Sequence, residues 1–133
     1  MKKLLVLLLL ISCGKTEQVN NNTIIIDENT GNPTSGIPDK EISAEEQEEL
    51  VDSTFILIRI GLAKHKKLDP SVQIILAFDE NSLVRYELSR NTTIDVLTQE
   101  ALSEDKEELT RSGLLSNPKV SKEIKKRLRK EKQ

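Results

Sequence analysis

A leucine recurs every 26 residues through the last two-thirds of the chain, at Leu50, Leu76, Leu102 and Leu128. Further columns keep the same step: Ile42, Leu68, Ile94 and Val120; Ser43, Asp69, Asp95 and Ser121; Leu57, Leu83 and Leu109; Arg59, Arg85 and Arg111; Leu62, Leu88 and Leu114. Periods of about 20 to 50 residues are typical of solenoids, in which each unit buries its apolar face by stacking on the next. The register therefore predicts a stack of similar units that serves as a binding scaffold.

Each unit is expected to contain two short helices. The column that begins with Ser43 supplies N-caps, because Ser and Asp side chains accept hydrogen bonds from first-turn amides. Pro70 stands at a first helical position, and Glu46 completes a capping box with Ser43. One helix of each pair is predicted over residues 43–51, 69–77, 95–103 and 121–131, and the other over 53–64, 80–90 and 106–116.

The leucine columns are expected to face the core, including Leu83 and Leu109. The helix over 53–64 is predicted to be the buried centre, because its apolar residues surround it almost completely. A β-hairpin over 72–78 and 84–88 is an alternative, since apolar and charged residues alternate strictly from Val84 to Leu88. The matching columns elsewhere do not alternate, which favours helices.

The first thirteen residues have the pattern of a secretion signal. Lys2 and Lys3 precede an apolar run over residues 4–11, which ends at Ser12 and Cys13. Eight apolar residues span about 12 Å as a helix, whereas a membrane crossing needs about 20 residues. We therefore expect a signal peptide over residues 1–12, with an uncleaved short anchor as the alternative.

The stretch Leu10-Ile11-Ser12-Cys13 resembles the lipobox of bacterial lipoproteins. The resemblance implies cleavage before Cys13, a diacylglycerol on its sulfur, and a further acyl chain such as palmitate on the new amino terminus. Two or more acyl chains hold a protein stably on a membrane. Gly14, where Asp would favour the inner membrane, directs the resemblance towards the outer membrane. The expected location is the cell envelope, with the protein lipid-anchored at the outer membrane.

Residues 13–38 are interpreted as the lipidated N-terminus and a flexible tether, and residues 39–133 as a helical repeat domain. The tether is rich in Lys, Thr, Gln, Asn, Gly and Pro and lacks a helical period. Its one apolar cluster, at 23–26, is alternatively a short strand or a docking segment. The expected fold is all-α: a short right-handed solenoid of about three and a half 26-residue helix-pair repeats after a disordered tether.

An acidic residue, a Val-Arg pair and an Asn turn follow one another between Asp79 and Asn91, and Asp105, Arg111 and Asn117 repeat the pattern. This unit resembles the variant leucine-rich repeat and related HEAT-type helical repeats, although its period departs from the usual length. In the first unit, Ser53 replaces the acid and His65-Lys66 replaces the turn. The resemblance implies a structural ladder: Arg59, Asp79, Arg85, Asp105 and Arg111. An anionic ligand site at the arginines is the alternative.

The sequence contains no recognisable catalytic constellation. His65 is the sole histidine and Cys13 the sole cysteine, which excludes a three-histidine metal centre and an internal disulfide within one chain. His65 is interpreted as a surface turn residue among lysines. We predict that the chain is not an enzyme and needs no metal, cofactor or small-molecule substrate.

Charge is distributed unevenly along the chain. Residues 39–52 contain seven acidic residues and one basic, whereas residues 117–133 contain eight basic and two acidic. Val120, Ile124 and Leu128 predict an apolar stripe that packs the last helix onto the stack. The candidate interaction surface is the remaining set of cations, Lys122, Lys125, Lys126, Arg129 and Lys130. A solubilising terminal cap is the default interpretation of these cations, and electrostatic attachment to an anionic partner is its functional rival.

Two functions remain open at this stage. The first is a membrane-anchored envelope lipoprotein that acts as a non-catalytic protein-interaction module with an envelope protein as its partner. The second is a membrane-acting or lipid-bridging protein that works through its basic C-terminal helix. Nucleic acid is not expected as a partner, because Phe55, Phe78 and Tyr86 are the only aromatic residues available for base stacking.

Overall fold

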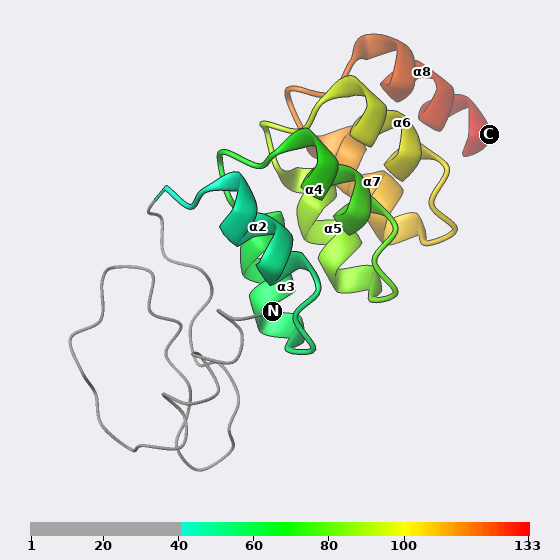
Figure 1. The fold of residues 1–133 in the computed structure, drawn as a ribbon. Coiled ribbons are helices and arrows are strands. Elements are labelled where there is room, and N and C mark those ends of the chain that lie inside the picture. Colours follow the sequence, from blue (N-terminus) through cyan, green and yellow to red (C-terminus); the bar gives the residue numbers. More distant parts are fainter. Residues whose placement is uncertain (1–40) are drawn as a thin grey trace, which may run out of the picture.

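The computed structural model describes residues 41–133, which fold into seven short α-helices (Figure 1). The helices are α2 (Ala44–Val51), α3 (Ile56–Ala63), α4 (Pro70–Ala77), α5 (Ser82–Arg90), α6 (Val96–Ser103), α7 (Glu108–Ser116) and α8 (Lys122–Glu131). Each lies within a range predicted to be helical, so the all-α class is confirmed. The hairpin alternative is wrong, because both of its strands fall in α4 and α5. The signal peptide, Cys13 and the tether lie outside the described residues.

The helices form two layers in alternating order. α2, α4, α6 and α8 follow one another in one layer, and α3, α5 and α7 follow one another in the other (Figure 1). Contacts join each helix to its neighbours along its own layer and to the adjacent helices of the other layer. The core is therefore a strip that runs from α2 to α8, and each unit contacts only the unit before it and the unit after it.

The predicted N-caps begin all four helices of the first layer. The Ser43 hydroxyl accepts from the Glu46 N–H at 3.2 Å, and the Glu46 carboxylate accepts from the Ser43 N–H at 2.9 Å, which completes the capping box. Asp69 accepts from the hydroxyl and the N–H of Ser71, and these two bonds lower the pKa of the Asp69 carboxyl. Asp95 and Ser121 cap α6 and α8 in the same way. The caps fix where each helix starts, and so they fix which residues face inwards.

Two leucine columns form the centre of the core. Leu76, Leu102 and Leu128 of the first layer meet Leu62, Leu88 and Leu114 of the second, and all six are buried. The apolar residue just before each cap is buried as well: Ile42, Leu68, Ile94 and Val120. This burial supplies the main free energy of folding, since each buried leucine contributes on the order of 2 kcal/mol.

The third leucine column does not belong to the core, and its assignment from the sequence is wrong. Leu57, Leu83 and Leu109 are 44%, 44% and 57% exposed. Each precedes a buried leucine of the same helix by five residues, a rotation of about 140° from it at 3.6 residues per turn. Both columns cannot face one core, so this one faces solvent.

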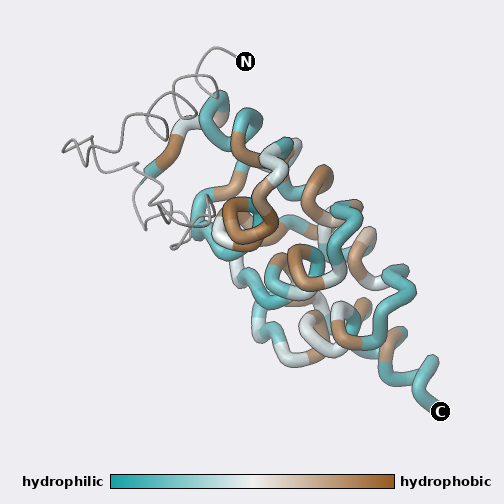
Figure 2. The backbone as a smooth tube through the Cα atoms, turned by 90° about the horizontal axis from the view of Figure 1, so that it is seen from below, coloured by the Kyte–Doolittle hydropathy of each residue, from teal (hydrophilic) through white to brown (hydrophobic). Residues whose placement is uncertain are grey.

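α3 is not the buried centre that its apolar sequence suggested. It lies at the edge of the second layer, where Phe55, Ile56 and Ile60 are only half buried. The central helix of that layer is α5, which has α3 on one side and α7 on the other. The tube in Figure 2 shows how apolar and hydrophilic segments alternate, and how the last helix is almost wholly hydrophilic. An edge helix keeps part of its apolar surface uncovered because no unit precedes it within the described residues.

Leu88→Ala and Leu83→Ala form a matched pair on α5. We expect Leu88→Ala to lower the free energy of unfolding by about 2 to 5 kcal/mol, because it leaves a cavity in the core. Leu83→Ala should cost less than about 1 kcal/mol, because the leucine side chain already faces water. Urea unfolding followed by circular dichroism measures both. Equal losses would show that the inward face of α5 is assigned incorrectly.

Candidate functional site

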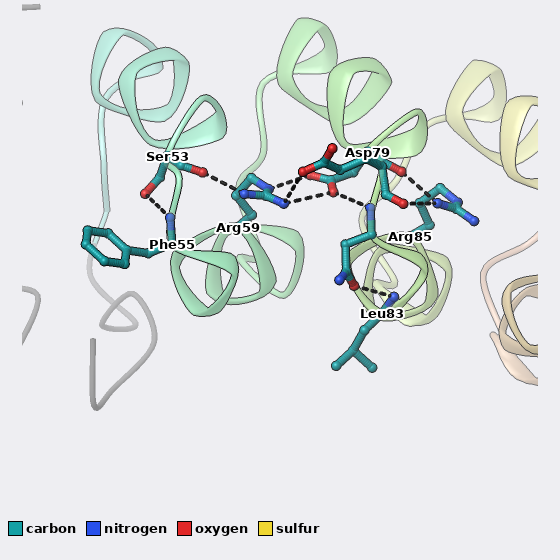
Figure 3. Close-up of polar contacts among 8 residues, drawn as sticks. Ser53, Phe55, Arg59, Asp79, Leu83 and Arg85 are labelled. Carbon is teal, nitrogen blue, oxygen red and sulfur yellow. Dashed lines mark hydrogen bonds and ion pairs between the residues drawn. The ribbon is translucent and has the colours of Figure 1, made fainter. Parts of the chain in front are cut away.

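Arginine and aspartate side chains join neighbouring units along the second layer (Figure 3). Arg59 donates from Nε to Asp79 Oδ2 at 2.7 Å and from Nη2 to Oδ1 at 3.3 Å. Arg85 makes the same bidentate pair with Asp105, at 2.5 and 3.2 Å. These side chains are at most 10% exposed, and the hydrogen-bonded Asp105 raises the pKa of Arg85. Bidentate geometry fixes both distance and orientation between units.

Each arginine also holds the turn that precedes its own helix. Arg59 Nη1 donates to the Ser53 carbonyl and Arg85 Nη1 to the Asp79 carbonyl, both at 2.7 Å. Arg111 Nη1 donates in the same way to the Asp105 carbonyl. Arg59 and Arg85 thus each bind both an aspartate of the next unit and a carbonyl of their own turn. Arg111 makes no ion pair with any residue in 41–133.

A second ladder consists of glutamines that the sequence analysis missed. Gln47, Gln73 and Gln99 are buried, and each donates from Nε2 to the carbonyl of the residue before its cap, at 3.1–3.2 Å. Each Oε1 accepts from the N–H of the cap residue one unit later, Asp69, Asp95 or Ser121, at 2.7, 2.8 and 3.0 Å. These glutamines keep the 26-residue step, so the register itself was the signal that could have revealed them.

A third ladder runs through the turns that end the second-layer helices. Asn91 Nδ2 donates to the carbonyls of Ala63 and His65 at 2.8 Å, and Asn117 Nδ2 donates to those of Ser89 and Asn91 at 2.9 Å. Each asparagine bonds to the corresponding turn of the preceding unit. The asparagines therefore couple units at the C-terminal ends of the second-layer helices, whereas the arginines bond to the turns before these helices.

His65 occupies the asparagine position of the first unit. The expectation of a surface histidine is wrong, because His65 is buried. Its Nδ1 accepts from the Lys67 N–H at 3.3 Å, as Asn117 Oδ1 accepts from the Lys119 N–H at 3.0 Å. The histidine therefore has a structural role in its turn.

The predicted interaction surface lies on the outward side of α8. Lys122, Lys126, Arg129 and Lys130 are exposed and Lys125 is half buried. In the part of the chain that the structure describes, none of the five makes an ion pair. Arg127 on the same helix differs, because it donates to Glu100 of α6 at 2.5 Å, which raises its pKa. One face of α8 is thus attached through Val120, Ile124, Leu128 and Arg127, and the other presents five cations.

Large apolar side chains lie on the surface of both layers. Phe78, the C-cap of α4, is 73% exposed, and Ile75 on α4 is 48% exposed. Val96 and Leu97 on α6 are 60% and 71% exposed. The column of Leu57, Leu83 and Leu109 runs along the second layer. Where such exposed apolar side chains form one contiguous patch, the patch marks a protein or membrane contact site.

Two chemical features are absent from the described residues. Residues 41–133 contain no group of three or more His, Cys, Asp or Glu side chains placed to bind a metal ion. None of the seven helices has both the length and the apolar character that a membrane span requires.

No known protein family, no curated protein and no solved structure matches this chain. The resemblances to lipoproteins and to helical repeats therefore depend on the motifs of the chain itself.

Asp105→Asn tests the arginine ladder. The change leaves the buried Arg85 guanidinium without its counter-charge, so we expect the free energy of unfolding to fall by about 3 kcal/mol. Its control is Glu104→Gln on the adjacent residue, whose side chain is 76% exposed and 3.9 Å from Arg127. The control should change the value by less than about 1 kcal/mol. Similar values for the two variants would contradict a structural role for the ladder.

Proposed function

We propose that this protein is a non-catalytic protein-interaction module, anchored to the outer membrane of a cell envelope by lipid on Cys13. The observation that carries the proposal is that polar side chains are buried between the units while large apolar side chains are exposed on the surface. The buried polar side chains of three ladders tie unit to unit, whereas large apolar side chains such as Phe78 and Leu97 stand in solvent. A scaffold held internally by directional bonds can keep such a surface in place for a partner.

The fold that we propose for this module is a short right-handed solenoid of about three and a half helix-pair repeats, related to the variant leucine-rich and HEAT-type repeats. Its support is the recurrence of the same bonds at the same step. The arginine ladder repeats from Arg59 to Arg85, and the glutamine ladder from Gln47 through Gln73 to Gln99. A residue 1–12 signal, a lipidated Cys13 and a tether to residue 38 complete the proposed organisation.

The five cations of α8 support docking of an acidic envelope protein. They are Lys122, Lys125, Lys126, Arg129 and Lys130, and they share one face of the helix. Long-range attraction to an acidic surface raises the rate of encounter, while apolar contacts supply lasting affinity.

The same cations favour a second candidate, a protein that bridges or perturbs membranes. Each lysine or arginine near an anionic lipid surface contributes about 1 kcal/mol of attraction at low salt. Such binding weakens steeply as ionic strength rises, whereas apolar docking does not. Salt dependence therefore separates the two candidates.

Affinity capture of the full-length protein from chemically cross-linked cells tests the proposal. We expect one discrete envelope protein, reduced when the five cations are changed to Gln. The matched control changes five exposed lysines outside α8 to Gln, and it should leave recovery unchanged: Lys64, Lys66, Lys67, Lys106 and Lys119. Cys13→Ser should release the protein from membranes after a salt wash. Recovery of lipid and bulk envelope proteins alone would favour the membrane-acting function, and retention of the Cys13→Ser variant on membranes would contradict the lipid anchor.

A further inference from the structure

A cleft of about 370 Å³ lies between α7 and α8, at the end of the array opposite α2. It is lined by Glu108, Arg111, Leu115, Leu128, Glu131 and Lys132. Lys132 pairs with Glu108 at 3.2 Å across one edge. Of the charged groups that line the cleft, Arg111 and Glu131 remain, and they lie beside the half-buried Leu115, whereas Leu128 is buried in the core.

The equivalent surface one unit earlier is covered by a helix. Arg85 and Ser89 correspond to Arg111 and Leu115, and α7 lies over both of them. The Arg85 guanidinium donates to the Asp105 carboxylate. The Gly113 backbone lies so close to Ser89 that a Cβ at Gly113 would be 1.9 Å from Ser89 Oγ. The cleft is therefore the seat that an α5-like or α7-like helix occupies elsewhere in this molecule.

Within residues 41–133, no carboxylate pairs with Arg111, unlike the other two arginines of the ladder. Its side chain donates one hydrogen bond to another residue of this range, from Nη1 to the Asp105 carbonyl. Arg59 and Arg85 make that bond and, in addition, bind a carboxylate through Nε and Nη2. Glu131 follows Arg111 by 20 residues, the separation of Arg59 from Asp79. However, it belongs to the last turn of α8 and makes no ion pair with Arg111.

The helices at the two equivalent positions share a pattern that describes what this cleft can hold. Each follows an aspartate in the preceding turn and has buried residues five and nine positions after it: Asp79, Val84 and Leu88 for α5, and Asp105, Thr110 and Leu114 for α7. The aspartate binds the arginine of the preceding unit, and the two buried residues pack into the core strip.

We propose that the cleft binds an amphipathic helix of a partner protein, headed by a carboxylate that pairs with Nε and Nη2 of Arg111. The residues of that helix five and nine positions after the acid face the cleft, and an apolar one packs on the half-buried Leu115. The inference rests on the proposed function as an interaction module and names one docking site and the chemistry of its partner. The Arg111 guanidinium can bind a carboxylate through two donors, and Leu115 beside it offers one apolar contact to the helix that carries the carboxylate.

A synthetic peptide with the sequence of residues 105–117 is the probe. Titrated into the isotope-labelled protein, it should give saturable NMR shifts confined to α7 and α8 around the cleft. A peptide with asparagine in place of its first residue should bind about tenfold more weakly, because the charge-assisted bidentate pair is lost. Absence of saturable shifts, shifts outside the cleft, or equal affinity for the two peptides would overturn the proposal.

Variants of the protein give an independent readout. Arg111→Gln should weaken binding about tenfold, with a small decrease in melting temperature because its Nη1 bond to the Asp105 carbonyl is lost as well. Glu131→Gln should strengthen binding by removing a competing carboxylate. Arg90→Gln is the control, because Arg90 is an exposed arginine on α5. The proposal would be overturned if Arg111→Gln left the peptide affinity unchanged, or if Arg90→Gln reduced the affinity as much as Arg111→Gln. These titrations use a defined peptide, so a negative result rejects the cleft even if cross-linking captures a partner, and a positive result stands even if it captures none.

Discussion

The hydrogen bond from each cap residue to the glutamine of the preceding unit is the constraint on which this array depends. Helices of eight to ten residues are too short to be stable alone, so they persist only through contacts with their neighbours. The turns between them bring backbone groups into the interior, where an unpaired N–H or carbonyl costs about 1 to 3 kcal/mol. Gln47 satisfies the Asp69 N–H and the Ile42 carbonyl with a single side chain. Gln73 and Gln99 repeat that arrangement in the next two units.

The arginine and asparagine ladders add the same coupling at other edges of the stack. Apolar burial is not directional, and leucines alone would allow one unit to slide or rotate on the next. The fork of Arg85 on Asp105 and the two carbonyl contacts of Asn117 each permit one geometry. Because these groups are buried, removing one partner leaves the other without compensation. The structure can thus leave Phe78, Leu97 and the cations of α8 in solvent without loss of its internal order.

The elements of the fold that depend on local chemistry could be predicted from the sequence. The caps at Ser43, Asp69, Asp95 and Ser121 act on adjacent residues, so their spacing placed the helix starts within a residue or two. The inward face of the second-layer helices could not be read from repetition alone, because Leu57 recurs as regularly as Leu62. Only the angle of about 140° between them shows that one of the two columns must face water.

The roles of the site residues were harder to predict from the sequence, because they depend on contacts between units. The glutamine column was not recognised and His65 was interpreted as a surface residue, although Gln73 and His65 are buried and bonded to main-chain groups. The six-residue step from Asp79 to Arg85 was the basis for expecting an acid and arginine ladder, but it did not show which aspartate each arginine binds. The ion pairs join units across 20 residues, from Arg59 to Asp79 and from Arg85 to Asp105. The cleft beside Arg111 depends on which ladder positions are filled, and this becomes visible only when equivalent positions are compared in space.

Native-state hydrogen exchange at the backbone amides of Asp69, Asp95 and Ser121 tests the central claim most directly. These three N–H groups lie in turns, outside any helix, and donate only to Gln47, Gln73 and Gln99. If the glutamine ladder couples the units, the three amides should be protected as strongly as core helical amides such as that of Leu88. Exchange at the rates of exposed turn amides would contradict the account.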